Sequence, residues 1–135
     1  MKYTFPYVQA GIIYRPIIPV TLRFKNIEVN YLALLDSGAD FNIFHADIAA
    51  ILKIDLKKQK RSMPFGGIHQ GAKDKGYVVS LQVGIKNQFH TAPVLFSPDI
   101  SENGYGILGQ QGFFNNFAVC FNYPLKTIDV YSQGE

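Results

Sequence analysis

The fold and the candidate chemistry of this chain are decided by the stretch LLDSGAD, residues 34–40. The apolar run YLALL, residues 31–35, has the composition of a buried strand, and Asp36 follows it directly, within a turn formed with Ser37 and Gly38. An ionised carboxylate beside apolar surface is costly unless it is paired, hydrogen-bonded or protonated, so Asp36 is a candidate functional residue. The alternative is a strand that ends in an ordinary Asx turn, because Asp, Ser and Gly all favour turns.

Two further motifs accompany this stretch. FGGIHQG, residues 65–71, has the glycines of a hairpin tip, and YGILG, residues 105–109, is an apolar-apolar-glycine element. In this order the three motifs resemble those of the retropepsins, the single-domain aspartic proteases of retroviruses and their cellular and bacterial relatives. The resemblance covers residues 20 to 131. It implies a mainly β fold, a retropepsin-like closed β-barrel with one or two short helices.

Length and composition fit one small domain. The 135 residues are enough for a real core but too few for the two lobes of a pepsin-type enzyme, so we expect a single domain over residues 1–135. The net charge is only +3, and the basic residues between positions 53 and 73 lack interleaved aromatics. A basic adaptor therefore has no support beyond charge, and we expect no nucleic-acid partner.

The single cysteine and the N-terminal residues indicate the cellular compartment in which the protein is expected. Cys120 lies in FAVCF, residues 117–121, a pattern typical of a buried strand, so we predict a small core residue and no intrachain disulfide. A lone thiol favours a reducing compartment. The first residues are not followed by the apolar stretch of a signal peptide, and no run approaches the ~18 apolar residues of a membrane span. We expect a soluble, cytoplasmic protein with no membrane partner.

Alternation and turn residues predict most of the secondary structure. A helix is expected over residues 46–53, with Ile48, Ile51 and Leu52 at helical spacing. A second, shorter helix is expected after Gly109. Hairpins are predicted for residues 20–24 with 27–31, 77–83 with 88–96, and 117–121 with 126–131.

The resemblance gives Asp36 a catalytic role. Peptide hydrolysis without a metal needs one group to accept a proton from water and another to give one to the carbonyl oxygen. Two adjacent carboxylates that share one proton can do both. Asp36 is the only acidic residue followed by Ser or Thr and then Gly. Its partner must therefore be Asp36 of a second copy, which implies a homodimeric aspartic endopeptidase acting on polypeptide substrates.

The family also implies roles for the neighbours of Asp36. Ser37 would place its hydroxyl across the dimer axis, and Gly38 would let the two loops approach while its N–H faces the carboxylates. Ala39 and Asp40 would contact the substrate, and Asp40 would accept hydrogen bonds from the substrate backbone. A plain loop carboxylate that caps a turn is the alternative for Asp40.

The hairpin tip and residue 110 complete the comparison with the family. Gly66, Gly67 and Ile68 would contact the substrate from a flap, although a plain surface loop would look similar. Many relatives carry an Arg after the motif at 107–109, paired with the residue that corresponds to Asp40, whereas this chain has Gln110. An amide can hydrogen-bond that carboxylate but supplies no charge-assisted pair.

Other motifs give no competing function. GYGILG, residues 104–109, matches a dinucleotide fingerprint, but no βαβ unit surrounds it. The three histidines share no metal-ligand spacing with each other or with Cys120, so neither a metal nor a cofactor is expected. The remaining alternative is a retropepsin-like binding or dimerisation module with little or no turnover. The intact sequence of residues 36–38 favours the enzyme.

Overall fold

The computed structural model describes residues 1–59, 62–64, 75–100 and 104–132. Most of the regular structure in this part of the chain is β, as the sequence predicts, with one α-helix and one 3-10 helix among the described elements. Within it, no helix is long and apolar enough to cross a membrane.

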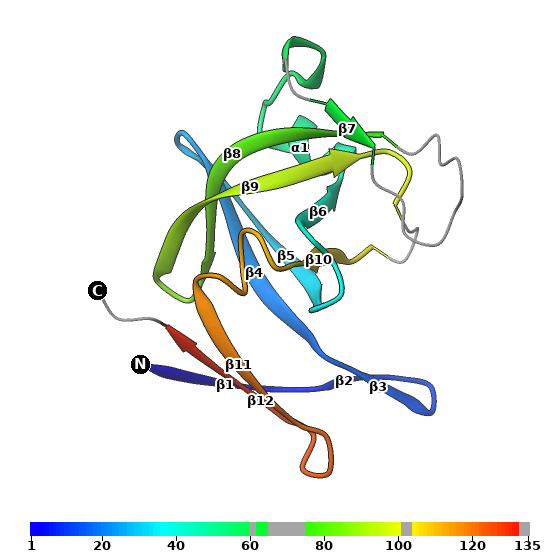
Figure 1. The fold of residues 1–135 in the computed structure, drawn as a ribbon, viewed down its shortest axis with the longest axis vertical. Helices are drawn as coiled ribbons and strands as arrows, with labels where there is room; N and C mark the ends of the chain where they lie inside the picture. The colour runs from blue at the N-terminus through cyan, green and yellow to red at the C-terminus, as the bar shows by residue number, and fades with distance from the viewer. Residues whose placement is uncertain (60–61, 65–74, 101–103, 133–135) are drawn as a thin grey trace.

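A closed ring of strands forms the centre of the molecule (Figure 1). The ring closes because β4 pairs with β5 on one edge and with β8 on the other. A further strand, β7 (Ser62–Pro64), extends the sheet beyond β8. In order around the ring, the strands are β4 (Ile17–Phe24), β5 (Ile27–Leu35), β10 (Gly106–Leu108), β6 (Asn42–His45), β9 (Gln88–Ser97) and β8 (Lys75–Ile85).

All three predicted hairpins are present; most of their strands are longer than predicted, and the last is shifted by one residue, to Thr127–Ser132. β4 and β5 pair from Ile17↔Leu34 to Phe24↔Ile27, and β8 pairs with β9 from Tyr77↔Phe96 to Ile85↔Gln88. The third hairpin joins β11 (Phe117–Asn122) to β12 (Thr127–Ser132).

The third hairpin belongs to a separate sheet below the barrel in Figure 1, of order β1-β12-β11. Here β1 (Lys2–Pro6) pairs with β12 in the same chain. A small hairpin of β2 (Val8–Ala10) and β3 (Ile13–Arg15) leads from this sheet to the barrel. On β11 the prediction of a buried cysteine is wrong: Phe117 faces the core, and Cys120, at the opposite parity of the strand, is exposed.

The first helix is confirmed as α1 (Ala46–Ile51), slightly shorter than predicted. His45 caps it, since the Nδ1 atom accepts a hydrogen bond from the Asp47 N–H at 3.0 Å. At the other end Lys53 turns left-handed, with φ 60°, and Ile54 N–H bonds to the Ala49 carbonyl at 2.9 Å. This is a Schellman ending, in which glycine is the usual residue at the left-handed position. A 3-10 turn, η1 (Leu56–Lys58), follows.

The second predicted helix is wrong. Residues 110–116 form successive turns, because Gly112 has φ 113° and the N–H groups of Phe114 and Asn115 bond five residues back to Gly109 and Gln110. An α-helix would bond four residues back. Two aromatic side chains of this region, Phe113 and Phe117, are nevertheless buried in the core.

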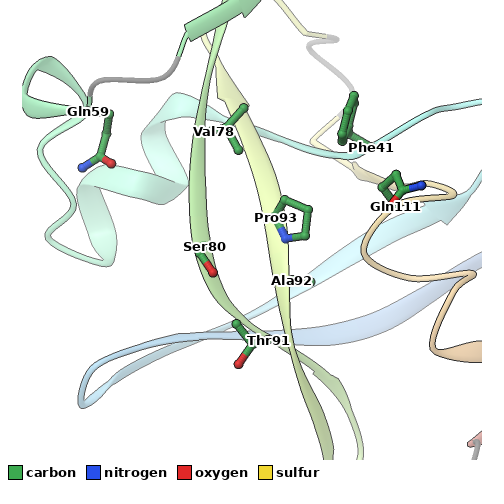
Figure 2. Close-up of a pocket in the computed structure, with 8 residues that line it drawn as sticks. All are labelled: Phe41, Gln59, Val78, Ser80, Thr91, Ala92, Pro93 and Gln111. Atoms are coloured by element: carbon green, nitrogen blue, oxygen red, sulfur yellow. The ribbon is translucent and has the colours of Figure 1, made fainter.

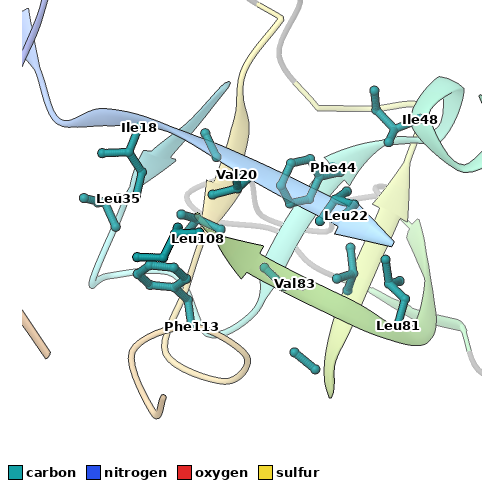
Figure 3. Packing of buried hydrophobic residues seen from close by; sticks show 14 of the residues in the cluster. Ile18, Val20, Leu22, Leu35, Phe44, Ile48, Leu81, Val83, Leu108 and Phe113 are labelled. Carbon is teal, nitrogen blue, oxygen red and sulfur yellow. The ribbon is translucent and has the colours of Figure 1, made fainter. Parts of the chain in front are cut away.

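Aliphatic and aromatic side chains from the ring strands fill the barrel. Figure 3 shows Val20 and Leu22 of β4, Phe44 of β6 and Val83 of β8 converging in this core. Each is at most 2 % exposed. Burial of such side chains stabilises a fold by about 1.5–3 kcal/mol apiece. The rigid core holds the strand ends from which the functional candidates emerge.

Candidate active site

Two neighbouring parallel strands of the barrel wall position Asp36. β5 runs beside β10, in register Leu35↔Leu108, and Asp36 continues this pairing by donating its N–H to the Leu108 carbonyl at 3.0 Å. β10 also pairs with β6 through Ile107↔Ile43. The segment from Asp36 to Asp40, which we call the Asp36 loop, therefore connects β5 to β6, the two strands that flank β10.

Within the loop, the carboxylate and its own backbone fix a tight turn. The Asp36 Oδ1 atom accepts the Gly38 N–H at 2.9 Å, and the Asp36 carbonyl accepts the Ala39 N–H at 3.0 Å. Asp36 is half-buried, while Ser37 and Gly38 are exposed. An Asx turn has the same geometry, so this bond fits both interpretations of the sequence. It also satisfies one carboxylate oxygen before any ligand arrives.

The two residues that follow Gly109 form hydrogen bonds to the backbone of the Asp36 loop. Gln110 and Gln111 donate their N–H groups to the carbonyls of Ala39 and Asp40, at 2.8 and 2.7 Å. The Gln110 side chain adds a third bond, from Nε2 to the Ser37 carbonyl at 2.6 Å. The amide thus binds the loop backbone, whereas the family comparison suggested a bond to the Asp40 carboxylate. Asp40 itself is exposed.

Asn42 is a site residue that the sequence did not reveal. It is fully buried; its Oδ1 atom accepts the Gly109 N–H at 3.0 Å, and its Nδ2 atom donates to the Pro93 carbonyl at 3.5 Å. One side chain therefore joins the start of β6, the end of β10 and the middle of β9. The available signal was a lone polar residue between Phe41 and Ile43, two residues after the loop.

Gly109 explains the glycine of the YGILG motif. A Cβ atom there would lie 2.5 Å from the Phe41 carbonyl oxygen and 2.8 Å from the Ala39 carbonyl oxygen. Both neighbours are backbone atoms that cannot rotate away. The close approach of the two chain segments thus requires glycine.

An open groove of about 740 Å³ lies beside the loop (Figure 2). Phe41 and Gln111 border it at one end, and outward-facing side chains of β8 and β9, such as Ser80 and Pro93, line it. None of its lining residues carries an ionisable group. The groove therefore supplies no acid or base, and we place the chemistry at the Asp36 loop.

Three predicted site residues are not among the residues that the structure describes. Gly66, Gly67 and Ile68, expected to form the flap, fall outside the described residues. Within the described ranges, no group of three or more His, Cys, Asp or Glu side chains is placed to hold a metal ion. Of the two carboxyl groups in the loop, Asp36 and Asp40, only that of Asp36 follows the paired strands and accepts the Gly38 N–H, and a single carboxyl group can act as an acid or a base but not as both at once.

Structural comparison identifies the fold. The chain superimposes on a retropepsin-like aspartic protease from Rickettsia conorii with a TM-score of 0.68 and 14 % identity, covering 97 % of this chain and 91 % of that one. It also matches EIAV protease, complexed with the inhibitor HBY-793, with a TM-score of 0.50 and 21 % identity over 76 % of this chain and 88 % of that one. No family model and no curated protein matches the sequence. The fold is thus the retropepsin-like barrel that the motifs imply.

Proposed function

We propose that the chain is an aspartic endopeptidase whose active site forms when two copies bring their Asp36 loops together. The observation that carries this proposal is the placement of Asp36. It follows the central strand pair of a retropepsin-like barrel, it is half-buried, and one of its oxygens already accepts the Gly38 N–H. A carboxylate held in this way has a fixed direction from which to act on a bound water.

In the proposed reaction, the two Asp36 carboxyls share one proton. The ionised carboxylate takes a proton from water as the water oxygen attacks the peptide carbonyl carbon. The protonated carboxyl gives its proton to the carbonyl oxygen, and a tetrahedral diol forms. The carboxyl that took the water proton then gives it to the amide nitrogen, while the other carboxylate takes a proton from one diol hydroxyl. The C–N bond breaks, which yields a free acid and a free amine and leaves the pair with one shared proton. Proton sharing between adjacent carboxyls supplies both roles at one pH.

The exposed side of the loop supports a second copy. Around Gly38, the only described heavy atom that an added Cβ would approach within 4 Å is Asp36 Oδ1, at 3.2 Å, and φ is not positive there. A methyl group here would press on the Asp36 carboxylate, which would have to move by a few tenths of an ångström. Glycine thus protects the position of the carboxylate, and in the proposed dimer it also lets the partner's loop come close, with the Ser37 hydroxyl facing that loop.

We further propose an extended polypeptide substrate beside the paired loops. Ala39 and Asp40 would contact its backbone, and Gly66, Gly67 and Ile68 would cover it. Extended peptides bind through backbone hydrogen bonds and alternate side-chain pockets. The cytoplasmic location stays part of this proposal, on the basis of the single cysteine.

The test compares wild type with Asp36→Asn on a degenerate peptide library across about pH 4 to 8, the range in which carboxyl pairs work. We expect the variant to lose at least about 100-fold in rate, because Asn preserves shape but supplies neither acid nor base. Asp99→Asn is the matched control, since Asp99 is exposed in a turn after β9. It should retain full activity.

Dilution tests the second copy. Specific activity should fall with protein concentration below the dimer dissociation constant, because a protomer holds half of the carboxyl pair. Cleavage by wild type that Asp36→Asn retains would refute the mechanism. A folded, associating protein that cleaves no library member would instead support the binding-module alternative.

A further inference from the structure

One peptide group in the Asp36 loop is hydrogen-bonded at both ends. The Ser37 carbonyl accepts Gln110 Nε2 at 2.6 Å, and the N–H of the same peptide unit, on Gly38, donates to Asp36 Oδ1 at 2.9 Å. The bonds form a directed chain from a side-chain amide, through one planar peptide, to a carboxylate. Because the peptide is planar, the bond at its oxygen also fixes the direction of its N–H.

This chain of hydrogen bonds couples Gln110 to Asp36 through one intervening peptide group. A carbonyl that accepts a hydrogen bond becomes more polarised, and its peptide N–H becomes a better donor, so neighbouring bonds in a chain strengthen one another. Such strengthening is about 10–30 % per bond. The Gln110 amide therefore helps to orient and to strengthen the hydrogen bond from the Gly38 N–H to Asp36 Oδ1.

The backbone of Gln110 is well anchored for this purpose. Its N–H donates to the Ala39 carbonyl at 2.8 Å, and its carbonyl accepts the Asn115 N–H at 3.1 Å. Gly109, one residue earlier, is held by buried Asn42. The side chain thus extends from a fixed point. A neutral amide also keeps its donor at every pH at which the enzyme would work.

We propose that Gln110 is a positioning residue, which holds the Ser37–Gly38 peptide on the Asp36 carboxylate. The effect on catalysis rests on the proposed function, whereas the effect on the conformation of the Asp36 loop does not. Gln110 would tune the orientation of the acid–base group and would not bind substrate. Its loss should consequently lower kcat and leave KM nearly unchanged.

The decisive measurement is amide hydrogen exchange of Gly38, followed by NMR in the full chain. Gln110→Met removes the donor and keeps the length of the side chain. We expect Gly38 to exchange about fivefold faster, in line with the loss of one hydrogen bond. Gln111→Met is the matched control, because the loop contact of Gln111 runs through its backbone N–H. It should leave the exchange rate of Gly38 as in wild type.

Two further readouts complete the test. Gln110→Arg keeps N–H donors at similar reach, so it should restore slow exchange, which a purely steric role for Gln110 would not predict. In the peptidase assay, Gln110→Met should lower kcat about threefold to tenfold with KM within about twofold of wild type. Unchanged Gly38 exchange in Gln110→Met would overturn the proposal. Faster Gly38 exchange in Gln110→Met, together with a wild type that cleaves no peptide, would support the contact and refute the proposed function.

Discussion

The Asp36 loop and the outer turns of the molecule follow opposite rules. Beside the loop, glycine stands where backbone segments meet, as at Gly109, and a buried side chain, Asn42, hydrogen-bonds the backbone N–H of that glycine. Four outer turns instead place lysine in the left-handed region that glycine prefers, with φ between 53 and 60°; they are Lys25, Lys53, Lys86 and Lys126. Local geometry is thus optimised around the carboxylate and left mildly strained elsewhere.

The largest effect should follow from removing the buried link of the loop. Asn42→Ala strips the partner from the Gly109 N–H and the Pro93 carbonyl inside the barrel. Leaving such groups unsatisfied costs about 1–3 kcal/mol, and we expect a loss near the upper end of that range. Urea unfolding monitored by circular dichroism measures it.

Asn30→Ala provides the control for this comparison. Asn30 is exposed on β5 and accepts a hydrogen bond from the Thr21 hydroxyl at 2.7 Å. Its removal should change the free energy of unfolding by less than about 0.5 kcal/mol. If the two asparagine variants lose equal stability, the loop is not specially supported.

A Cβ atom at residue 109 should push the loop aside. Gly109→Ala places it 2.5 Å from the Phe41 carbonyl oxygen, so backbone must shift. Overpacking of this kind costs about 1–3 kcal/mol, and we expect about 2 kcal/mol by urea unfolding, with reduced peptidase activity. Gly38→Ala places its Cβ 3.2 Å from Asp36 Oδ1, so we expect it to displace the carboxylate and to weaken association, as measured by analytical ultracentrifugation. A Gly109→Ala variant with wild-type stability would contradict the close approach.

Much of the barrel could be predicted from the sequence because its signals are local. Alternating residues and turn dipeptides gave the three hairpins, and helical spacing gave α1. The helix expected after Gly109 is absent because Gly112, with φ 113°, turns the backbone out of the helical conformation. Cys120 was misplaced because FAVCF is apolar on both faces, so the pattern could not say which face is covered.

The site was predictable only where a motif marks it. Asp36, Ser37 and Gly38 stand in a recognisable turn, and the structure places them in one loop at the end of β5. Asn42 escaped because its partners, Gly109 and Pro93, are distant in sequence and meet it only through the strand order. The direction of the Gln110 side chain is likewise a tertiary property.

Relieving backbone strain in an outer turn should raise the free energy of unfolding by a moderate amount. Lys53→Gly removes a left-handed lysine at the end of α1 while keeping the Schellman bonds of the backbone. We expect a gain of up to about 1 kcal/mol, because a side chain in the left-handed region costs about 1–2 kcal/mol and glycine loses part of that gain through unfolded-state entropy. Thermal unfolding measures it. Activity should not change, and a lower midpoint would show that the turn is not strained.

The smallest effect concerns the link between residues 110 and 40. A guanidinium at 110 can bond the Ser37 carbonyl, as the amide does, and also reach toward the exposed Asp40 carboxylate. A double-mutant cycle of Gln110→Arg and Asp40→Asn should give a coupling of about 0.2–1 kcal/mol in dimer affinity. Zero coupling would indicate that the two side chains do not meet, and would weaken the proposed substrate role of Asp40.

The hydrogen bond between Gln110 and the Asp36 loop also determines when the site forms during folding. Gln110 and Ser37 are 73 positions apart, so the carboxylate and its anchors meet only after a long stretch of chain has closed. Loop-closure entropy opposes such distant pairing, and β-rich domains of this topology fold in about milliseconds to seconds. A nascent chain therefore carries Asp36 well before Gly109 and Gln110 have been synthesised. Any hydrolytic capacity follows completion of the barrel, not synthesis of the motif.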